Sequence, residues 1–167
     1  MDLLNRPLPD FALPDLNGHL HRLSDGRGRI VIVNFWSCEC PHVERTDAAL
    51  LTLLQRWGEA VWLLPIASNA NESVEALDRV ARAHGLPWVL HDPHQEVADR
   101  LGATVTPEVF IVDREGVLRY HGAPDDVTFR QRTPTRSYVE EVVEALLAGT
   151  LPSLTETPPF GCSIVRQ

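Results

Sequence analysis

The chain alternates between short apolar runs and segments in which apolar residues recur at helical spacing. The runs RIVIVNFW (29–36) and AVWLLPIAS (60–68) are nearly continuous and contain several β-branched residues. Such runs are typical of central strands that are covered on both faces. The segment 41–57 instead brings its apolar residues onto one helical face and is followed by a glycine, which predicts a helix.

The rest of the chain continues this alternation. We expect a short hairpin over 1–28 and a proline-rich, extended tail over 150–167. Further helices are predicted over 70–85, 95–102 and 137–149, and further strands over 88–92, 108–113 and 117–122. This order predicts an α/β fold, an α+β sandwich with a central mixed β-sheet flanked by helices, in a single domain over 1–167.

Composition and charge narrow the possible partners. The 167 residues are 44% hydrophobic, which is enough for a buried core of ordinary size. The net charge is −8 and the 15 basic residues are scattered, which disfavours nucleic acid or an anionic membrane as a partner. The apolar run 60–67 is among the longest and falls well short of the ~18 residues of a membrane span.

The chain has three cysteines, Cys38, Cys40 and Cys162. Its first residues, MDLLNRPLPDF, carry prolines and charges where a secretory signal needs an apolar core, so we expect a cytoplasmic protein. In a reducing compartment a disulfide is transient and catalytic rather than structural. An odd number of cysteines also disfavours a structural disulfide framework.

Cys40 stands where the predicted strand 29–36 passes into the predicted helix. Pro41 suits the first helical position because its missing N–H would be unpaired there, and this makes Cys40 the N-cap residue. The free N–H groups and the dipole of a helix N-terminus favour a negative sulfur over a neutral thiol. The alternative is a small buried side chain, but the strand–Cys–Pro–helix context favours a reactive thiol.

Three neighbours of Cys40 are expected to modify its reactivity. Ser37 can donate a hydrogen bond to the sulfur or to a substrate oxygen, and a protonated His42 would add positive charge. Glu39 opposes this effect, because an adjacent carboxylate disfavours a thiolate. Trp36, at the end of the strand, is expected in the core or lining a cleft.

The segment VIVNFWSCECP resembles the active-site segment of the thioredoxin superfamily, in its thiol-specific-antioxidant branch (AhpC/TSA, peroxiredoxin-like or redoxin). LPDFALPDLNGHLHRLSD resembles the N-terminal hairpin of that branch, and LGATVTPEVFIVDREGVLRYHG its cis-proline strand and following hairpin. The ending GCSIVRQ resembles a subgroup that carries Gly-Cys near its C-terminus. The order and spacing of these segments imply a thioredoxin-like fold with a redox-active cysteine.

The resemblance also assigns roles to particular residues. Cys40 matches the attacking cysteine, and Thr106-Pro107 matches the pair whose proline is cis and lies against the active sulfur. The sequence departs from the pattern in three respects. Val43 stands where thioredoxin-like reductants have their second cysteine, and Val33 stands where the peroxiredoxin signature has proline. No arginine can be assigned to peroxide activation, the candidates being Arg130, Arg132 and Arg136.

A second thiol must resolve an oxidised Cys40. Cys38 is close in sequence, but the Cβ atoms of such a pair tend to diverge, so their disulfide would be strained. Cys162 lies on the tail, which can fold back over the site, and we favour it as the resolving cysteine. Cys38, Cys40 and His42 could also bind soft metal ions, but alternate residues diverge around a helix that begins at Pro41, which disfavours a metal site.

These observations predict a thiol-dependent oxidoreductase that needs no cofactor. The leading prediction is peroxiredoxin-like, antioxidant reduction of hydrogen peroxide or organic hydroperoxides through a Cys40 sulfenic acid, with a thioredoxin-like dithiol as reductant. The first alternative is thiol-disulfide exchange on protein disulfides, and the second is a non-enzymatic redox sensor or metal carrier. The sequence leaves the oligomeric state open.

Overall fold

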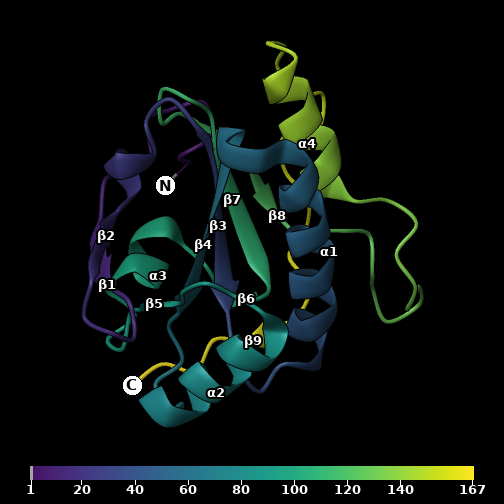
Figure 1. Cartoon of the computed structure of the whole chain (residues 1–167). Helices are drawn as coiled ribbons and strands as arrows, with labels where there is room; N and C mark the ends of the chain where they lie inside the picture. The colour runs from purple at the N-terminus through teal and green to yellow at the C-terminus, as the bar shows by residue number, and fades with distance from the viewer. Residues whose placement is uncertain (1) are drawn as a thin grey trace.

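The computed structural model describes residues 2–167, so Met1 of the predicted domain lies outside the described residues. Its central feature is a five-stranded sheet with the order β5-β4-β3-β7-β8 (Figure 1). The strands are β3 (Ile30–Trp36), β4 (Val61–Ala67), β5 (Leu90–His91), β7 (Glu108–Val112) and β8 (Leu118–Gly122). β4 runs parallel to β3 and β5, whereas β7 is antiparallel to β3 and β8. The predicted mixed sheet is confirmed.

Helices lie on both faces of this sheet, as predicted. They are α1 (Pro41–Trp57), α2 (Val74–His84), α3 (Glu96–Leu101) and α4 (Tyr138–Leu147), with short 3-10 turns at Leu23–Gly26 and Gly58–Ala60. α2 begins later than the predicted 70–85, because Ser73 caps it by accepting a hydrogen bond from the N–H of Ala76. None of the helices within residues 2–167 has the length and apolar character to cross a bilayer.

The alternating side chains of β3 divide the core into two layers. Ile30, Ile32 and Trp36 pack into the layer that includes α1, α2 and α4. Val31, Val33 and Phe35 pack into the other layer, with α3 and the N-terminal segment. Every residue of β3 is buried, which explains why its sequence reads as a continuous apolar run.

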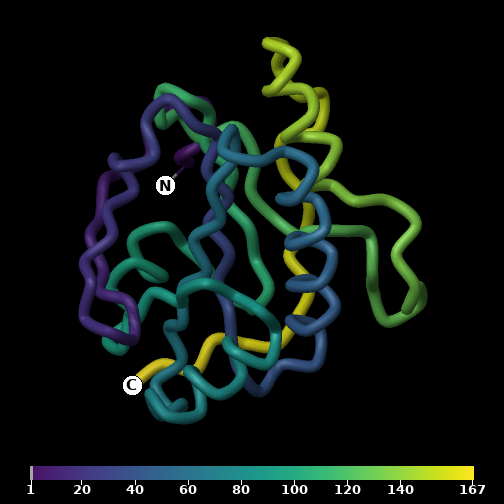
Figure 2. The backbone as a smooth tube through the Cα atoms, in the orientation of Figure 1, coloured from purple at the N-terminus to yellow at the C-terminus, as the bar shows by residue number. Residues whose placement is uncertain are grey.

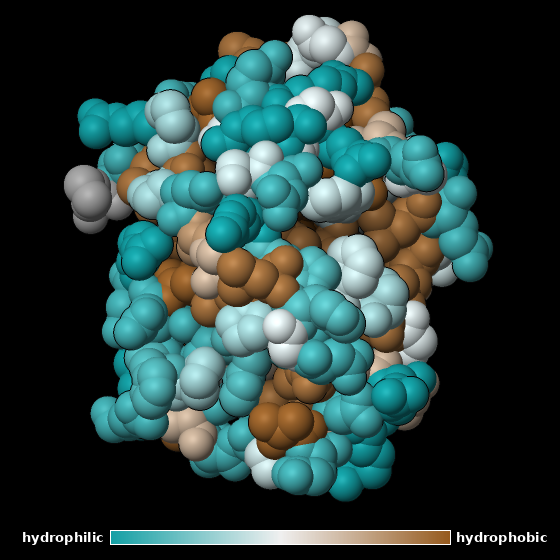
Figure 3. All heavy atoms as spheres, turned by 60° about the vertical axis from the view of Figure 1, so that its left-hand side comes forward, coloured by the Kyte–Doolittle hydropathy of each residue, from teal (hydrophilic) through white to brown (hydrophobic). Residues whose placement is uncertain are grey.

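The predicted N-terminal hairpin is present as β1 (Ala12–Pro14) and β2 (Leu20–Arg22), which pair antiparallel. It lies on the α3 side of the sheet (Figure 1). The surface on this side is mostly hydrophilic and is interrupted by separate apolar patches (Figure 3).

The C-terminal tail crosses the molecule and ends beside the active-site segment. It passes along α1 and then beneath the sheet toward α2 (Figure 2). There β9 (Cys162–Ser163) pairs antiparallel with β6 (Val105–Thr106), in a separate two-stranded sheet. The tail is extended, as predicted, and it brings the third cysteine to the end of β3.

Candidate active site

Cys40 is the N-cap residue of α1, with Pro41 in the first turn, as predicted. Its side chain is buried, with 6% of its surface exposed. The expected hydrogen bonds from the helix N-terminus to the sulfur are not formed. The Cys40 sulfur instead lies 3.3 Å from the carbonyl oxygen of Thr106, to which the thiol can donate. The acceptor thus comes from the last residue of β6, and the N-terminus of α1 supplies no hydrogen bond to the sulfur.

Cys162 is the nearest sulfur to Cys40. In the β6–β9 register Cys162 lies opposite Thr106, and the sulfur atoms of Cys40 and Cys162 are 2.6 Å apart. Both cysteines are free thiols in this structure. Burial raises the pKa of the Cys162 thiol, and its hydrogen bond with Cys40 acts in the same direction. A small movement would bring the two sulfurs to the ~2.05 Å length of a disulfide bond.

Thr106 lies directly against this pair, and Pro107 follows it. The Thr106-Pro107 peptide bond is cis, as the resemblance implied. The Thr106 side chain is buried, and its hydroxyl has no hydrogen-bond partner among the described residues. The backbone of Thr106 therefore makes the contacts with both cysteines, through its carbonyl group and its strand pairing.

Cys38 has a different environment from the other two cysteines. It is half-buried, and its backbone N–H lies 3.4 Å from the carboxylate of Glu72. Burial, followed by the negative charge of Glu72 and then Glu39, raises the pKa of Cys38 to about 12. A thiol in this environment stays protonated near neutral pH and is a poor nucleophile.

Ser37 does not donate to the Cys40 sulfur, so this expectation is wrong. Its hydroxyl donates to Glu72 at 2.6 Å and accepts from the side-chain amide of Asn69 at 3.0 Å. Asn69 and Glu72 follow β4, and the parallel register of β3 and β4 brings the loops after both strands to the same edge of the sheet. This buried network fixes the turn that carries Cys38.

Trp36 is a core residue, and it does not line a cleft. It is fully buried, and its indole N–H donates to Asp47 of α1 at 2.7 Å. The same carboxylate oxygen lies 2.6 Å from the Nδ1 atom of His84 in α2. Burial raises the pKa of Asp47, against the opposing effect of these two hydrogen bonds. Trp36 thus supports the site by linking β3 to α1 and α2.

His42 contacts an aromatic side chain of the tail. Its ring packs edge-on against Phe160, with ring centres 5.1 Å apart. Phe160 in turn packs edge-on against Phe129 of the loop before α4, at 4.8 Å. The Phe129 side chain is 85% exposed. Sequence reasoning missed both phenylalanines, because their contacts join three segments that are far apart in the sequence.

No arginine has a hydrogen bond to the Cys40 sulfur within residues 2–167. Of the three candidates for peroxide activation, Arg136 is paired with Glu141 at 2.6 Å. Arg130 and Arg132 are exposed on the loop before α4. The structure therefore assigns no arginine to the activation of a peroxide at Cys40.

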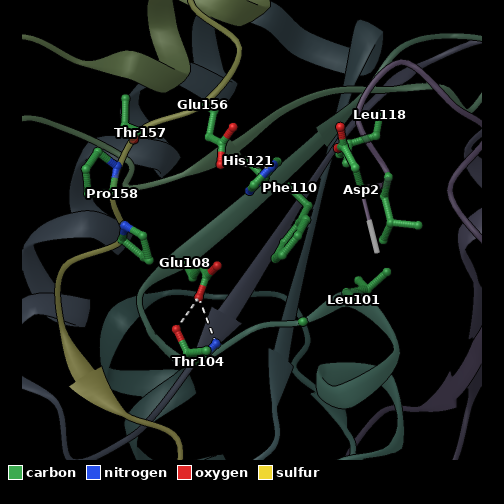
Figure 4. A pocket seen from close by; sticks show the side chains of 13 residues that line it. Asp2, Leu101, Thr104, Glu108, Phe110, Leu118, His121, Glu156, Thr157 and Pro158 are labelled. Atoms are coloured by element: carbon green, nitrogen blue, oxygen red, sulfur yellow. Dashed lines mark hydrogen bonds and ion pairs between the residues drawn. The ribbon is translucent and has the colours of Figure 1, made fainter.

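A cavity of about 870 Å³ lies on the face of the sheet opposite to Cys40 (Figure 4). Phe110 and His121 stack in its wall, and the tail residues Glu156 and Thr157 border it. Burial raises the pKa of Glu108, which accepts hydrogen bonds from the backbone of Thr104. Cys40 packs in the opposite core layer and does not line this cavity.

The sequence profile of the AhpC/TSA family matches residues 4–121. Residues of this chain are 31% identical to thiol-disulfide oxidoreductase ResA of Geobacillus kaustophilus over 115 positions, covering 66% of this chain and 64% of ResA. They are 30% identical to thiol:disulfide interchange protein DsbE of Allochromatium vinosum over 122 positions, covering 71% of this chain and 65% of DsbE. The matched part thus spans just under two thirds of the length of these relatives.

Solved structures match over more of the chain. A hypothetical protein of Sinorhizobium meliloti 1021 superimposes with a TM-score of 0.89 and 30% identity, over 100% of this chain and 96% of that one. The thioredoxin domain of a thiol-disulfide oxidoreductase of Bacteroides vulgatus superimposes with a TM-score of 0.62 and 20% identity, over 71% of this chain and 86% of that one. The fold is therefore thioredoxin-like, as the sequence resemblance implied.

The predicted cytoplasmic location is contradicted by these comparisons. The ResA and DsbE relatives are membrane-anchored or periplasm-facing thiol-disulfide proteins. The prediction rested on the polar residues at the start of the sequence. A leader or anchor that precedes the folded part of such a protein leaves no mark within that part, so polar first residues do not indicate the location.

Proposed function

Because the chain belongs to the AhpC/TSA family, we propose that it is a thiol-disulfide oxidoreductase whose working pair is Cys40 and Cys162. The observation that carries this proposal is the 2.6 Å distance between the two sulfurs, across the β6–β9 pairing. The names of the ResA and DsbE relatives support disulfide exchange. Disulfide exchange, the first alternative predicted from the sequence, has better support than peroxide reduction.

The proposed reaction reduces a protein disulfide in two steps. The Cys40 thiolate attacks one substrate sulfur, so that a Cys40–substrate disulfide forms and the second substrate sulfur leaves as a thiolate and takes up a proton. The Cys162 thiolate then attacks the Cys40 sulfur, forming the Cys40–Cys162 disulfide and releasing the first substrate sulfur. Two electrons pass from the cysteine pair to the substrate. An external thioredoxin-like dithiol returns the pair to its reduced form.

The surroundings of each cysteine suit these roles. Cys40 is held between the N-terminus of α1 and the carbonyl group of Thr106. Cys162 lies in β9, whose pairing with β6 covers two residues, so few backbone hydrogen bonds must break for it to move away and return. The pKa of both other thiols is raised, that of Cys38 to about 12 and that of Cys162 to about 11, but Cys162 is the one whose sulfur lies 2.6 Å from that of Cys40.

A single-turnover experiment with insulin as the disulfide probe tests this function. The reduced chain should release two insulin thiols per molecule and acquire a Cys40–Cys162 crosslink. The Cys162→Ser variant should release one thiol and remain joined to insulin through Cys40, and Cys40→Ser should not react. The matched control Cys38→Ser should behave like the unchanged chain.

Two outcomes would contradict the proposal. One is a Cys162→Ser variant that completes the reaction through a Cys40–Cys38 crosslink. The other is a chain that leaves insulin intact but consumes hydrogen peroxide rapidly, which would restore the leading prediction of the sequence.

A further inference from the structure

The tail lies on the active site as an extended peptide would. Its strand β9 pairs with β6, with Cys162 opposite Thr106 and Ser163 opposite Val105. The next residue continues the contact, since the N–H of Ile164 donates to the carbonyl oxygen of Thr104 at 2.9 Å. Backbone pairing of this kind supplies affinity that does not depend on sequence, whereas pockets for individual side chains supply specificity.

The position before Cys162 accommodates only glycine. A Cβ atom added to Gly161 would lie 2.1 Å from the carbonyl oxygen of Thr106 and 3.2 Å from the Cδ atom of Pro107. Thr106 ends β6 and contacts Cys40 through the same carbonyl group, and Pro107 follows it through a cis peptide bond, so they cannot move aside without disturbing the site. Any peptide that places its cysteine at Cys40 in this register meets the same restriction.

The position two residues before Cys162 is an aromatic site. Phe160 lies between His42 at the start of α1 and Phe129 of the loop before α4, with edge-on packing to each. Phe129 is 85% exposed and so presents an apolar ring to solvent beside Phe160. Aromatic pairs in this arrangement contribute more than the burial of their area.

We propose that this edge recognises an extended protein segment with the order aromatic–Gly–Cys, and that residues 160–162 are a tethered copy of that segment. This inference rests on the proposed function and names its substrate class. Because the tail and the substrate need the same strand edge, the substrate displaces β9 when it joins Cys40. The return of the tail then brings Cys162 to Cys40 and expels the reduced substrate.

The contacts on either side of this segment are consistent with local displacement. On the N-terminal side, Thr157 is held by the Tyr120 hydroxyl at 2.6 Å and by the N–H of Ala123 at 3.0 Å. On the C-terminal side, Val165 donates to Asn69 at 2.8 Å, and Arg166 pairs with Asp99 at 2.8 Å. The segment between Thr157 and the buried Ile164 can therefore lift while both ends stay in place, and it returns in the same register.

The test uses synthetic peptides on the Cys162→Ser chain of residues 1–167, in which a Cys40–peptide disulfide accumulates. The probes are disulfide-linked dimers of PPFGCSI, PPFACSI and PPAGCSI. Each reaction yields one Cys40–peptide adduct and one free peptide thiol, and mass spectrometry gives the rate. The glycine-to-alanine peptide should react about tenfold more slowly than PPFGCSI, because its methyl group overpacks the site. The peptide without phenylalanine should react about fivefold more slowly.

A variant tests the aromatic site directly. Phe129→Ala, added to the Cys162→Ser chain, should reduce the difference in rate between PPFGCSI and PPAGCSI. Because Phe129 is 85% exposed, this substitution leaves the packed core intact. Equal rates for the three peptides would overturn the inference, as would a rate difference that Phe129→Ala leaves unchanged.

A small aromatic disulfide, 5,5′-dithiobis(2-nitrobenzoate), separates the two proposals. It reports the reactivity of Cys40 without needing the strand edge. If Cys40 in the Cys162→Ser chain fails to react with it, the proposed function falls. If Cys40 reacts with it but does not discriminate among the peptides, the proposed function stands and the aromatic–Gly–Cys preference is wrong.

Discussion

The sulfur atoms of Cys40 and Cys162 lie 2.6 Å apart, although 122 positions separate them in the chain. The pairing of β9 with β6 produces this contact, because it sets Cys162 opposite Thr106, whose carbonyl group also faces Cys40. One residue, at the end of β6, thus positions both thiols. The following predictions test this arrangement and the side chains that support it.

Mild oxidation should join Cys40 to Cys162 within one chain. With one equivalent of diamide, we expect peptide mass spectrometry to find this crosslink in the unchanged chain and in Cys38→Ser. Because the disulfide closes a loop of more than 100 residues, the oxidised form should be about 4 kcal/mol more stable to urea than the reduced form. A crosslink between Cys38 and Cys40, or one between two chains, would contradict this prediction.

Substitution of Gly161 should slow the crosslink without removing either thiol. In Gly161→Ala the added methyl group meets the carbonyl oxygen of Thr106, so β9 must shift and move Cys162 away from Cys40. The rate of crosslinking by diamide should fall about tenfold. The exposed neighbour Ser163 provides the matched control, and Ser163→Ala should crosslink at the unchanged rate. Equal rates in both variants would show that the close approach of Gly161 to Thr106 is not needed for the Cys40–Cys162 crosslink.

Asp47 should be important for stability although it does not contact a cysteine sulfur. In Asp47→Ala, the buried indole N–H of Trp36 and the Nδ1 atom of His84 lose their acceptor. An unsatisfied buried donor costs about 1–3 kcal/mol, and we expect a loss in this range or above it in urea denaturation. Asp78→Ala, which removes the exposed pair with Arg82, should change stability by less than about 1 kcal/mol.

The same carboxyl group should contribute a measurable dependence of stability on pH. Burial raises the pKa of Asp47 in the folded chain. Its stabilising contribution is therefore complete below the unfolded pKa of about 3.9 and is lost as the pH rises through the higher folded pKa. In a His84→Gln background, which removes the titration of the neighbouring imidazole, the stability advantage of Asp over Asn at position 47 should decrease from pH 4 to pH 7. A constant difference would contradict the assignment.

The parts of the site that could be predicted from sequence are those that local interactions determine. The apolar run before Cys40 forms a strand, and Pro41 begins a helix, because both preferences act within a few residues. The partners of Ser37 could not be predicted, because Glu72 reaches it only through the parallel pairing of β3 and β4. The direction of the Cys40 side chain was also missed, since its acceptor comes from the distant residue Thr106.

The fold was easier to predict than the function for a related reason. Alternating strands and helices leave a periodic pattern in the sequence, and the motif around Cys40 carries the family resemblance. Peroxide reduction and disulfide exchange both begin with the same thiolate, so the motif alone does not separate them. They differ in the groups that surround the sulfur, and these come from loops and from the tail.

Glu72 should control the reactivity of Cys38. Burial, and then the charge of this carboxylate, raises the pKa of the Cys38 thiol to about 12. Glu72→Gln removes the charge but keeps an oxygen that can accept from Ser37, so the pKa of Cys38 should fall while burial holds it above its ordinary value. In a Cys40→Ser/Cys162→Ser chain, iodoacetamide should then alkylate Cys38 faster at pH 9, because more of the thiol is ionised. Glu39→Gln should have a smaller effect, since Glu39 acts more weakly on Cys38. An unchanged rate in Glu72→Gln would mean that burial alone keeps Cys38 protonated and out of the exchange.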